Sequence, residues 1–589
     1  MRFSLSLSLS LLAAVIPSFA SLSEPLVARR VDNGLVARQS RPPPPPAGCT
    51  NAQSKLCWDG KFDISSNYYT TGPRTGVKRV YRWTLQNVTL SPDGVPRMVL
   101  AMNGQLPGPT IIANWGDTIE VHLTNGLKDN GTSIHWHGIR QFENSKNDGV
   151  NGVTECPLAP GQTKVYSFIA EQYGTTWYHS HYSAQYGDGV WGAIQINGPA
   201  TAEYDIDLGT VTLSEWFRPK TAFQAALDAE RTGPPRAQNF LINGTNANPS
   251  DTTQGKRFKA TFTPGKKHRI RFINTAVDTF FRVALDGHNM TVIQSDFVPV
   301  NPYVTQNVGI AIGQRYDVII EANQAASSYW LRAWPQISCS AANDNDGTTT
   351  GYIAYQGVTA LPTSTATLPT DSCTDEQTLI PYVPITVDST GFPGNQSSIP
   401  VSAPNRVTVN GDMVFRWDIN GATMNIDFDY PTLQQLADGN TTWPAALNPI
   451  FIDQANRTAY WVIQNQSPVA HPIHLHGHDF NVVAQGTGTF DATTTTLKWS
   501  NPTRRDVAML PGNGYLFIAF RTDNPGTWVM HCHIAWHVSE GLSLQLVERQ
   551  AEIFDHMSLD AEWTKTCSDF ETWYNPATLA YGKKTDSGL

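Results

Sequence analysis

The chain has 589 residues, 40% of them hydrophobic, which suffices for three or four domains with cores of their own and argues against a disordered protein. Its net charge is −9 and it contains no block of Lys and Arg, which argues against nucleic acid as a partner. Only 15% of the residues are charged, while Gly (45) and Pro (39) are frequent, as expected for short strands joined by turns.

The first twenty residues are predicted to be a secretion signal rather than part of the fold. Arg2 precedes an apolar stretch over residues 5–16, and residues 18–20 (Ser-Phe-Ala) have the form of a cleavage site. The apolar stretch is too short to span a bilayer, and no other apolar run reaches the necessary length. Residues 21–45 are predicted to be a propeptide with a Pro-rich spacer. We therefore expect a secreted protein without a membrane segment.

Alternating apolar and polar residues predict β-strands along the rest of the chain. In residues 118–124, for example, Ile119, Val121 and Leu123 share one face. Long amphipathic helices are scarce, and the best short candidates are residues 223–231 and 552–563. The pattern predicts an all-β protein of sandwiches or barrels. Similar strand segments are residues 165–170, 193–196, 269–273, 316–320 and 515–520.

Two changes in composition predict domain boundaries. Residues 199–202 read Pro-Ala-Thr-Ala, and residues 361–372 are rich in Thr, Ser and Pro. With these boundaries the three predicted domains are residues 46–200, 201–370 and 371–589.

Eight sequons of the Asn-x-Ser/Thr type agree with secretion and predict N-glycans at some of these positions. The chain also has seven cysteines, and an odd number in a secreted protein leaves one thiol to be explained. The sequons begin at Asn87, Asn130, Asn243, Asn289, Asn395, Asn440, Asn456 and Asn465.

Ten histidines form the strongest functional pattern of the sequence. Eight of them make four His-x-His pairs, two early and two late in the chain, which suggests a metal site between two related domains. Side chains at i and i+2 of a strand share a face, so eight imidazoles from four strands could hold a cluster of three ions. The pairs are His135 and His137, His179 and His181, His474 and His476, and His531 and His533.

Cys532 lies between the last two histidines and is therefore predicted to face the other side of its strand. There it could meet His537, five residues on, and His471, which precedes the third pair. Two imidazoles and one thiolate are the donors of a blue-copper site. One strand would then carry metal ligands on both faces, and the odd cysteine would be a ligand. The other histidines are predicted to be structural: His122, His268, His288, His478 and His556.

Four segments resemble the copper signatures of multicopper oxidases, specifically of ascomycete fungal laccases. The resemblance covers nearly the whole mature chain and implies three cupredoxin-like Greek-key β-domains. The segments are His135-Trp-His-Gly138, running on to Asp148-Gly-Val and Cys156-Pro; Gly174-Thr-Thr-Trp-Tyr-His-Ser-His181; His471-Pro-Ile-His-Leu-His-Gly-His478; and His531-Cys-His-Ile-Ala-Trp-His537, through Gly541-Leu542.

The resemblance implies four copper ions: one of type 1, one of type 2 and a pair of type 3. Type 1 copper would take His471, Cys532 and His537. Type 2 copper would take His135 and His474. The type 3 pair would take the remaining six histidines: His137, His179, His181, His476, His531 and His533.

Further residues are assigned by the same resemblance. Leu542 stands where ascorbate oxidases have Met; it cannot coordinate, which implies a raised copper potential. Asp278 matches a proton acceptor of the substrate pocket, and Asp148 an acid near type 2 copper that helps to supply protons. Ala535 replaces an Asp of basidiomycete laccases, in agreement with the ascomycete type.

The resemblance also implies three disulfides, Cys49–Cys57, Cys156–Cys567 and Cys339–Cys373, whereas the sequence alone leaves all 15 pairings of six cysteines open. The last four residues, Asp-Ser-Gly-Leu, resemble a C-terminal tail that enters a solvent channel toward the copper cluster, so no further processing is expected there.

The expected function is that of an extracellular, monomeric laccase. It would oxidise diphenols, methoxyphenols or aromatic amines by one electron at a time and reduce O2 to water. A specialised oxidase remains an alternative: a pigment- or secondary-metabolite phenol-coupling enzyme, a bilirubin-type oxidase or a ferroxidase. A copper-storing or structural cupredoxin would have lost ligands, and none is missing from the four segments.

Overall fold

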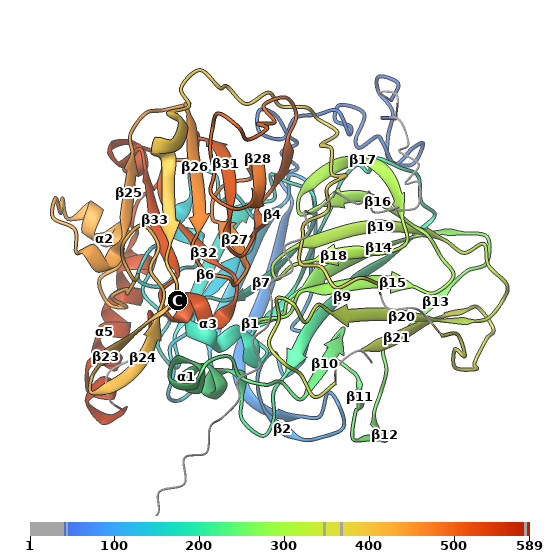
Figure 1. The fold of residues 1–589 in the computed structure, drawn as a ribbon, viewed down its shortest axis with the longest axis horizontal. Coiled ribbons are helices and arrows are strands. Elements are labelled where there is room, and N and C mark those ends of the chain that lie inside the picture. Colours follow the sequence, from blue (N-terminus) through green and yellow to red (C-terminus); the bar gives the residue numbers. More distant parts are fainter. Residues whose placement is uncertain (1–40, 43–44, 346–348, 366–368, 582–585) are drawn as a thin grey trace, which may run out of the picture. The chain divides into compact units, whose positions relative to one another are not determined.

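The computed structural model describes residues 41–42, 45–345, 349–365, 369–581 and 586–589. The predicted secretion signal and most of the predicted spacer lie outside these residues. The described part of the chain consists mainly of β-strands, which confirms the all-β prediction (Figure 1).

The first two sheets have the strand orders β2-β1-β4-β6 and β3-β8-β7-β5. Each contains one parallel pair, β1 with β4 and β3 with β8, among antiparallel neighbours. Their strands are β1 (Lys78–Leu90), β2 (Arg97–Met102), β3 (Ile111–Asn114), β4 (Thr118–Asn125), β5 (Ile134–Trp136), β6 (Thr163–Ile169), β7 (Gly174–Ser180) and β8 (Trp191–Asn197).

The middle sheets have the orders β10-β9-β14-β19-β16-β17 and β13-β21-β20-β15-β18. The short strands β11 (Ala247–Asn248) and β12 (Asp251–Gly255) form a separate hairpin. The other strands are β9 (Ile206–Trp216), β10 (Asn239–Ile242), β13 (Lys259–Phe262), β14 (Lys267–Asn274), β15 (Phe281–Leu285), β16 (Met290–Ser295), β17 (Val298–Thr305), β18 (Val308–Ile310), β19 (Arg315–Glu321), β20 (Ser328–Pro335) and β21 (Thr350–Tyr355).

The last sheets have the orders β22-β26-β31-β28-β29 and β25-β33-β32-β27-β30. β23 (Asn405–Val409) and β24 (Asp412–Arg416) form a hairpin beside them. The other strands are β22 (Ser398–Val401), β25 (Pro449–Ile452), β26 (Thr458–Asn465), β27 (His471–Leu475), β28 (Phe480–Thr487), β29 (Thr503–Arg505), β30 (Val507–Leu510), β31 (Gly514–Arg521), β32 (Gly526–Cys532) and β33 (Ser543–Glu548).

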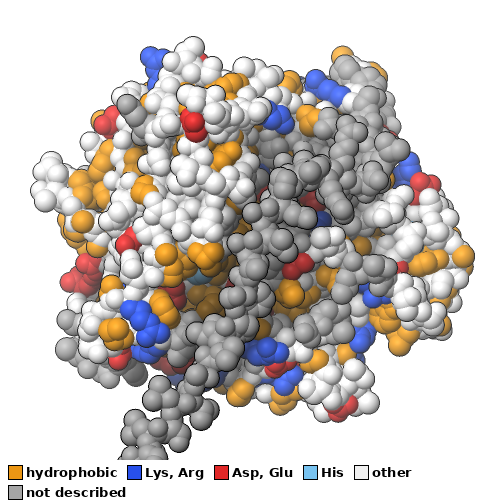
Figure 2. Space-filling view, in the orientation of Figure 1, with side chains coloured by type: hydrophobic (Ala, Val, Ile, Leu, Met, Phe, Trp, Pro, Cys, Tyr) orange, Lys and Arg blue, Asp and Glu red, His pale blue; other side chains and the backbone are white. Residues whose placement is uncertain are grey.

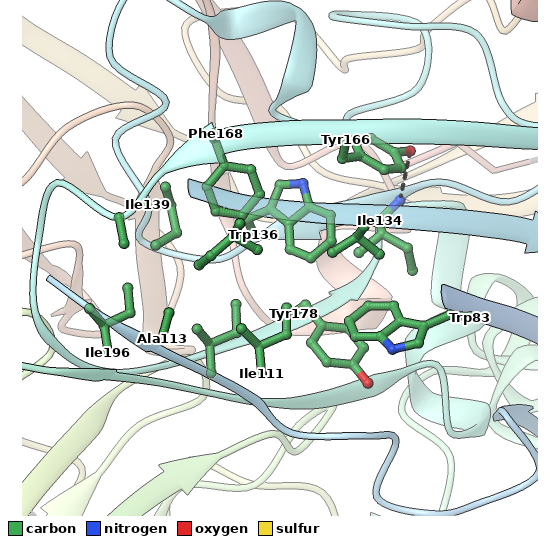
Figure 3. Packing of buried hydrophobic residues seen from close by; sticks show 14 of the residues in the cluster. Trp83, Ile111, Ala113, Ile134, Trp136, Ile139, Tyr166, Phe168, Tyr178 and Ile196 are labelled. Carbon is green, nitrogen blue, oxygen red and sulfur yellow. Dashed lines mark hydrogen bonds between the residues drawn. The ribbon is translucent and has the colours of Figure 1, made fainter. Parts of the chain in front are cut away.

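The three pairs of sheets repeat one plan, in which each sheet has a single parallel strand pair. In the first pair the core is aromatic: Trp83, Trp136 and Tyr178 pack among aliphatic side chains from both sheets (Figure 3). In β4 buried residues alternate with half-buried ones, as the sequence predicts. These are cupredoxin-like domains; the predicted boundaries near residues 200 and 370 remain predictions.

Helices are few in the described residues. Helix α1 (Ala222–Thr232) confirms the prediction over residues 223–231, and it begins with a capping box in which Thr221 and Gln224 bond each other's backbone N–H groups. The remaining helices are η1 (Ser145–Asn147), η2 (Ser183–Asp188), η3 (Gly394–Ser397), α2 (Thr432–Ala437), η4 (Ala445–Leu447), α3 (Ala535–Ser539), η5 (Gln550–Glu552), α4 (Ile553–His556) and α5 (Ala561–Tyr581).

The prediction of a short helix near residues 552–563 was confirmed in part, since α4 and the start of α5 lie there, but wrong in its extent. The helical conformation is interrupted between α4 and α5, and α5 is 21 residues long. Its sequence carries Pro576 and a weak apolar stripe, so tertiary contacts sustain it: Phe570 is fully buried and the Trp563 indole donates to the Thr154 carbonyl. None of the described helices combines the length and hydropathy needed to cross a bilayer.

The face of the molecule in Figure 2 carries acidic and basic side chains singly rather than in a patch of one sign. This agrees with the absence of a Lys/Arg block in the sequence.

Candidate metal centre

The four His-x-His pairs lie at the ends of four strands. β5, β7, β27 and β32 each end one residue before the second histidine of a pair. The first histidines are in register: His135 is paired with His179, and His474 with His531. This refines the sequence expectation, because only the first member of each pair is inside its strand.

The eight imidazoles form one buried cluster. Two early rings stack on two late rings with centroids 3.9 Å apart, His135 on His476 and His137 on His474. The His476 and His531 Nε2 atoms are 3.2 Å apart, as are His137 Nδ1 and His533 Nε2. The nitrogens converge in three groups: His137, His179 and His533; His181, His476 and His531; and His135, His137 and His474.

In most of these histidines, hydrogen bonds determine which of the two ring nitrogens faces the centre of the cluster. Five rings place Nδ1 2.8–3.0 Å from a carbonyl or carboxylate oxygen, which suits an Nδ1–H donor and leaves Nε2 facing the cluster. Within the described residues, the inward Nε2 atoms of His135, His179 and His474 have no hydrogen-bond partner. Buried nitrogens without partners are costly unless they bind a ligand, so this cluster fits metal ions. The five rings are those of His135, His179, His474, His476 and His531.

Burial favours the neutral form of several cluster imidazoles, which is the form that binds metal. Desolvation lowers the pKa of His531 to about 4, and burial together with neighbouring histidines lowers the pKa of His179 and His476 well below the ordinary range.

A second group of donors lies on the other side of β32. Cys532 Sγ is 3.5 Å from Nδ1 of His471 and from Nδ1 of His537, and these two nitrogens are 3.1 Å apart. All three side chains are buried, and Cys532 is the free cysteine of the described residues. Burial raises the pKa of the thiol, so a metal cation is needed to displace its proton. The trigonal donor set fits copper.

The packing around this second group includes residues that the sequence analysis did not single out. The Trp417 ring lies 4.8 Å from that of His471 and 4.6 Å from that of His537, and its indole N–H donates to Glu540 over 3.0 Å. Leu542 is fully buried; its carbonyl accepts from the Cys532 N–H, and its side chain offers no ligand atom. No local motif marks Trp417 as part of this site.

Asp148 touches two histidines of the cluster. One carboxylate oxygen lies 2.8 Å from His476 Nδ1 and the other 3.3 Å from His135 Nδ1, and the Asp148 carbonyl is 2.9 Å from the same nitrogen of His135. The residue is fully buried. It therefore orients ligands assigned to two different copper types, whereas the sequence predicted only an acid near type 2 copper.

Asp278 lies near the second donor group rather than the histidine cluster. Its carboxylate accepts the indole N–H of Trp536, the neighbour of His537, over 3.0 Å. Burial, reinforced by the nearby Glu215 carboxylate, raises the pKa of Asp278 to about 7. Glu215 itself accepts the N–H groups of Val277 and Asp278, so this loop is held in place. Glu215 was not predicted.

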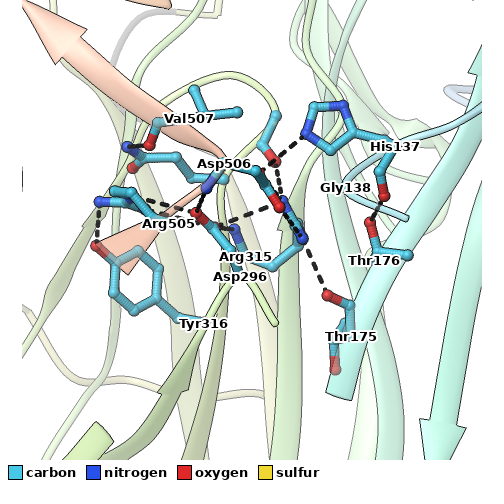
Figure 4. A network of polar contacts seen from close by, with 12 residues as sticks. His137, Gly138, Thr175, Thr176, Asp296, Arg315, Tyr316, Arg505, Asp506 and Val507 are labelled. Atoms are coloured by element: carbon cyan, nitrogen blue, oxygen red, sulfur yellow. Dashed lines mark hydrogen bonds and ion pairs between the residues drawn. The ribbon is translucent and has the colours of Figure 1, made fainter. Parts of the chain in front are cut away.

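A buried ionic network adjoins the cluster and was also missed (Figure 4). Arg315 bonds both oxygens of Asp506, at 2.5 and 2.7 Å, and one of these oxygens is 3.4 Å from His137 Nε2. Asp296 connects this pair to Arg505. The members come from segments far apart in sequence, so no motif could have identified them.

The five histidines predicted to be structural belong to none of the donor groups in the described residues. His478 lies 2.9 Å from Glu548, and His288 Nε2 lies 2.9 Å from the Tyr355 hydroxyl. The others contact Glu120, Phe262 and Glu143: His122, His268 and His556 respectively.

The three disulfides agree with the resemblance, while the place of the tail in a solvent channel stays a prediction. The bonds are Cys49–Cys57, Cys156–Cys567 and Cys339–Cys373. Residues 586–589 are buried, and the Gly588 carbonyl accepts the Asn151 side-chain amide, three residues after Asp148.

The sequon residue Asn465 is 1% exposed and its amide donates to two carbonyls, so it is a poor glycan acceptor; the other seven are exposed or half-buried.

Comparisons with known proteins agree with this geometry. Three family models, each described as multicopper oxidase, match residues 84–201, 207–358 and 396–552. The chain belongs to the multicopper oxidase family. It is an enzyme of the laccase type, since several of its relatives are ascomycete laccases. Laccase-2 of Botryotinia fuckeliana is 43% identical over 577 residues, which cover 95% of this chain and 96% of that one.

Solved structures give the same result. The crystal structure of a laccase from Botrytis aclada has a TM-score of 0.84 at 42% identity and covers 91% of this chain and 99% of that chain. Fet3p, described as a multicopper oxidase that functions in iron import, has a TM-score of 0.74 at 27% identity, over 84% and 95% of the two chains. The family implies copper as the cofactor, and both donor groups fit it.

Proposed function

We propose that this enzyme is an extracellular laccase that oxidises phenolic donors by one electron at a time and reduces O2 to water. The observation that carries the proposal is the His531-Cys532-His533 run at the end of β32. Cys532 belongs to one donor group and its two neighbours belong to the other. A single strand end thus joins the sulfur-containing donor group to the histidine cluster by covalent bonds, an arrangement that would suit electron transfer between metals bound at the two.

We infer that His471, Cys532 and His537 hold type 1 copper and that His135 and His474 hold type 2 copper. The type 3 pair would be held by two convergent triads. When bound, the coppers supply one-electron acceptance from the donor and the reduction of O2. The triads are His137, His179 and His533, and His181, His476 and His531.

Asp278 would accept the proton that a phenol loses as it is oxidised. The Trp536 N–H holds the carboxylate next to the type 1 ligands, and a pKa of about 7 makes it an effective base near neutral pH. Asp148, bonded to both His135 and His476, would hold ligands and supply protons on the O2-reducing side.

Oxygen uptake by the copper-loaded protein tests the proposal. A methoxyphenol, Fe(II), bilirubin and ascorbate are compared at equal concentrations, with peroxide assayed in parallel and copper counted per chain. Rapid uptake with the phenol, no free peroxide and four coppers per chain are expected. Uptake dominated by Fe(II) or bilirubin would instead indicate a specialised oxidase, and fewer coppers would contradict the ligand assignment.

A further inference from the structure

The middle sheets contribute one turn to the histidine cluster, although they supply none of its histidines. The turn runs from β18 to β19 and contains Gly313. A Cβ atom on Gly313 would lie 2.9 Å from His137 Cε1 and 3.0 Å from His533 Cδ2, and its φ of +83° favours glycine as well. The backbone of this turn is therefore in direct contact with two candidate ligands.

Arg315 begins β19 and ties this turn to both other parts of the site. Its Nε donates to the Thr175 carbonyl on β7 over 3.0 Å, and its Nη1 donates to the Gly313 carbonyl over 3.1 Å. The two terminal nitrogens bond the two oxygens of Asp506, which lies between β29 and β30 (Figure 4). The Arg315 and Asp506 side chains are fully buried, so water cannot take the place of either partner in this bidentate ion pair.

Asp506 in turn contacts two candidate ligands. Its carbonyl oxygen is 2.8 Å from His474 Nδ1, and its carboxylate is 3.4 Å from His137 Nε2. His137 thus differs from the five rings that turn Nε2 inward: its Nδ1 faces His533, and its Nε2 faces Asp506. His137 Nε2 makes no hydrogen bond within the described residues, and the carboxylate that faces it is held in one plane by the Arg315 guanidinium.

We propose that Arg315 is a positioning residue of the trinuclear site, acting through Asp506 to hold His137 with Nδ1 toward the metal. The inference rests on the proposed function, because it needs the cluster to hold copper. It gives the middle part of the chain a role in metal binding that the four histidine segments do not reveal.

The test compares Arg315→Lys with Arg269→Lys. Arg269 is a matched control because it is a buried, ion-paired arginine on the neighbouring strand β14, bonded to Asp317 and to none of the ligands. Lys keeps the charge in both variants but lacks the planar fork with which Arg315 reaches both oxygens of Asp506 and the Thr175 carbonyl at the same time. The readouts are copper per chain after dialysis against a chelator, the near-ultraviolet band of the type 3 pair and the blue band of type 1 copper.

Arg315→Lys is expected to retain trinuclear copper about 10- to 100-fold less well than the wild type and to alter the type 3 band, with the blue band unchanged. Arg269→Lys should keep all copper signals. If both variants lose only thermal stability, or if Arg315→Lys loses the blue and type 3 bands equally, the inference is wrong.

Asp506→Asn provides a second route if Arg315→Lys does not fold. It should produce the same change of the type 3 band, and the double variant should be no worse than Asp506→Asn, because both residues act on the same ring. Additive losses would overturn the inference. The wild type separates the two proposals: if it does not bind four coppers, the proposed function fails, whatever the variants do.

Discussion

At the scale of single residues, Cys532 is the side chain on which the proposed chemistry depends. It is the free cysteine of the described residues and the sulfur donor of the trigonal group. Cys532→Ser should abolish the blue colour and reduce phenol-driven oxygen uptake to background, because a hydroxyl is a hard and weak ligand for copper. The other three coppers should still bind.

Absorption spectra and copper counts check this prediction. His288→Gln is the control, since His288 is a buried histidine of the middle sheets outside the donor groups and should leave the colour intact. Retained blue absorption in Cys532→Ser would rule out the type 1 assignment.

Asp278 supports a prediction about pH. Its carboxylate is protonated below its pKa of about 7, so it can accept a phenolic proton only as the pH rises through that value. The ratio of phenol oxidation to oxidation of a non-phenolic donor should therefore rise with pH in the wild type. In Asp278→Asn the ratio should be flat, and kcat/KM for the phenol should fall by about 100-fold.

Stability measurements provide the control for this variant. Because the pKa of Asp278 is raised in the folded protein, the folded state keeps a proton that the unfolded chain releases. The Asp278 side chain therefore lowers the free energy of unfolding as pH rises from about 4 to about 7. Asp278→Asn should be at least as stable as the wild type at pH 8. Equal kinetic losses for both donors would contradict the proton-acceptor role.

At the scale of elements, α5 depends on its connection to the rest of the chain. The Cys156–Cys567 bond joins this helix to a loop 411 residues earlier. Replacing both cysteines by Ser should destabilise the protein by about 2–4 kcal/mol and shorten its half-life at high temperature. It should also speed proteolysis within α5, because the weak apolar stripe alone does not sustain the helix.

The matched control replaces Cys339 and Cys373, whose bond closes only 34 residues. This variant should lose less stability and leave the proteolysis of α5 unchanged. Thermal inactivation rates and limited proteolysis measure both effects. Equal cleavage of α5 in the two variants would show that the disulfide does not anchor the helix.

At the scale of the whole molecule, the buried histidines make the copper-free protein sensitive to acid. Burial lowers the pKa of His471 to about 3 and of His531 to about 4, whereas the unfolded chain takes up these protons near pH 6.5. Stability of the copper-free protein should therefore fall as pH drops below about 6.5, by up to about 1.4 kcal/mol per pH unit for each such histidine. The buried carboxyls of Asp278, Asp506 and Glu540, whose pKa is raised, act in the opposite direction, but the donor histidines with lowered pKa outnumber them. Unfolding temperatures of chelated protein between pH 7 and 5 measure the net effect; an unchanged value would contradict the prediction.

The fold could be predicted in outline because its signal is local. Alternation in segments such as β4 indicates which face is buried, and the amphipathic pattern over residues 223–231 indicates α1. α5 could not be predicted, since its stability comes from a disulfide and from contacts with residues far away in sequence. The start of α5 does have a local signal, because the Asp560 carboxylate accepts the Trp563 N–H as an N-cap does.

The sequence by itself predicted the donor groups, because the His-x-His spacing and the His-Cys-His run place the candidate ligands close together at the ends of strands. It could not determine which nitrogen of each ring turns inward, since that depends on oxygens supplied by Asp148, Ser180 and Asp506. Only the tertiary structure brought Arg315 and Gly313 to the cluster. Metal ligands carry a short-range pattern, whereas the groups that orient them need only be near in space.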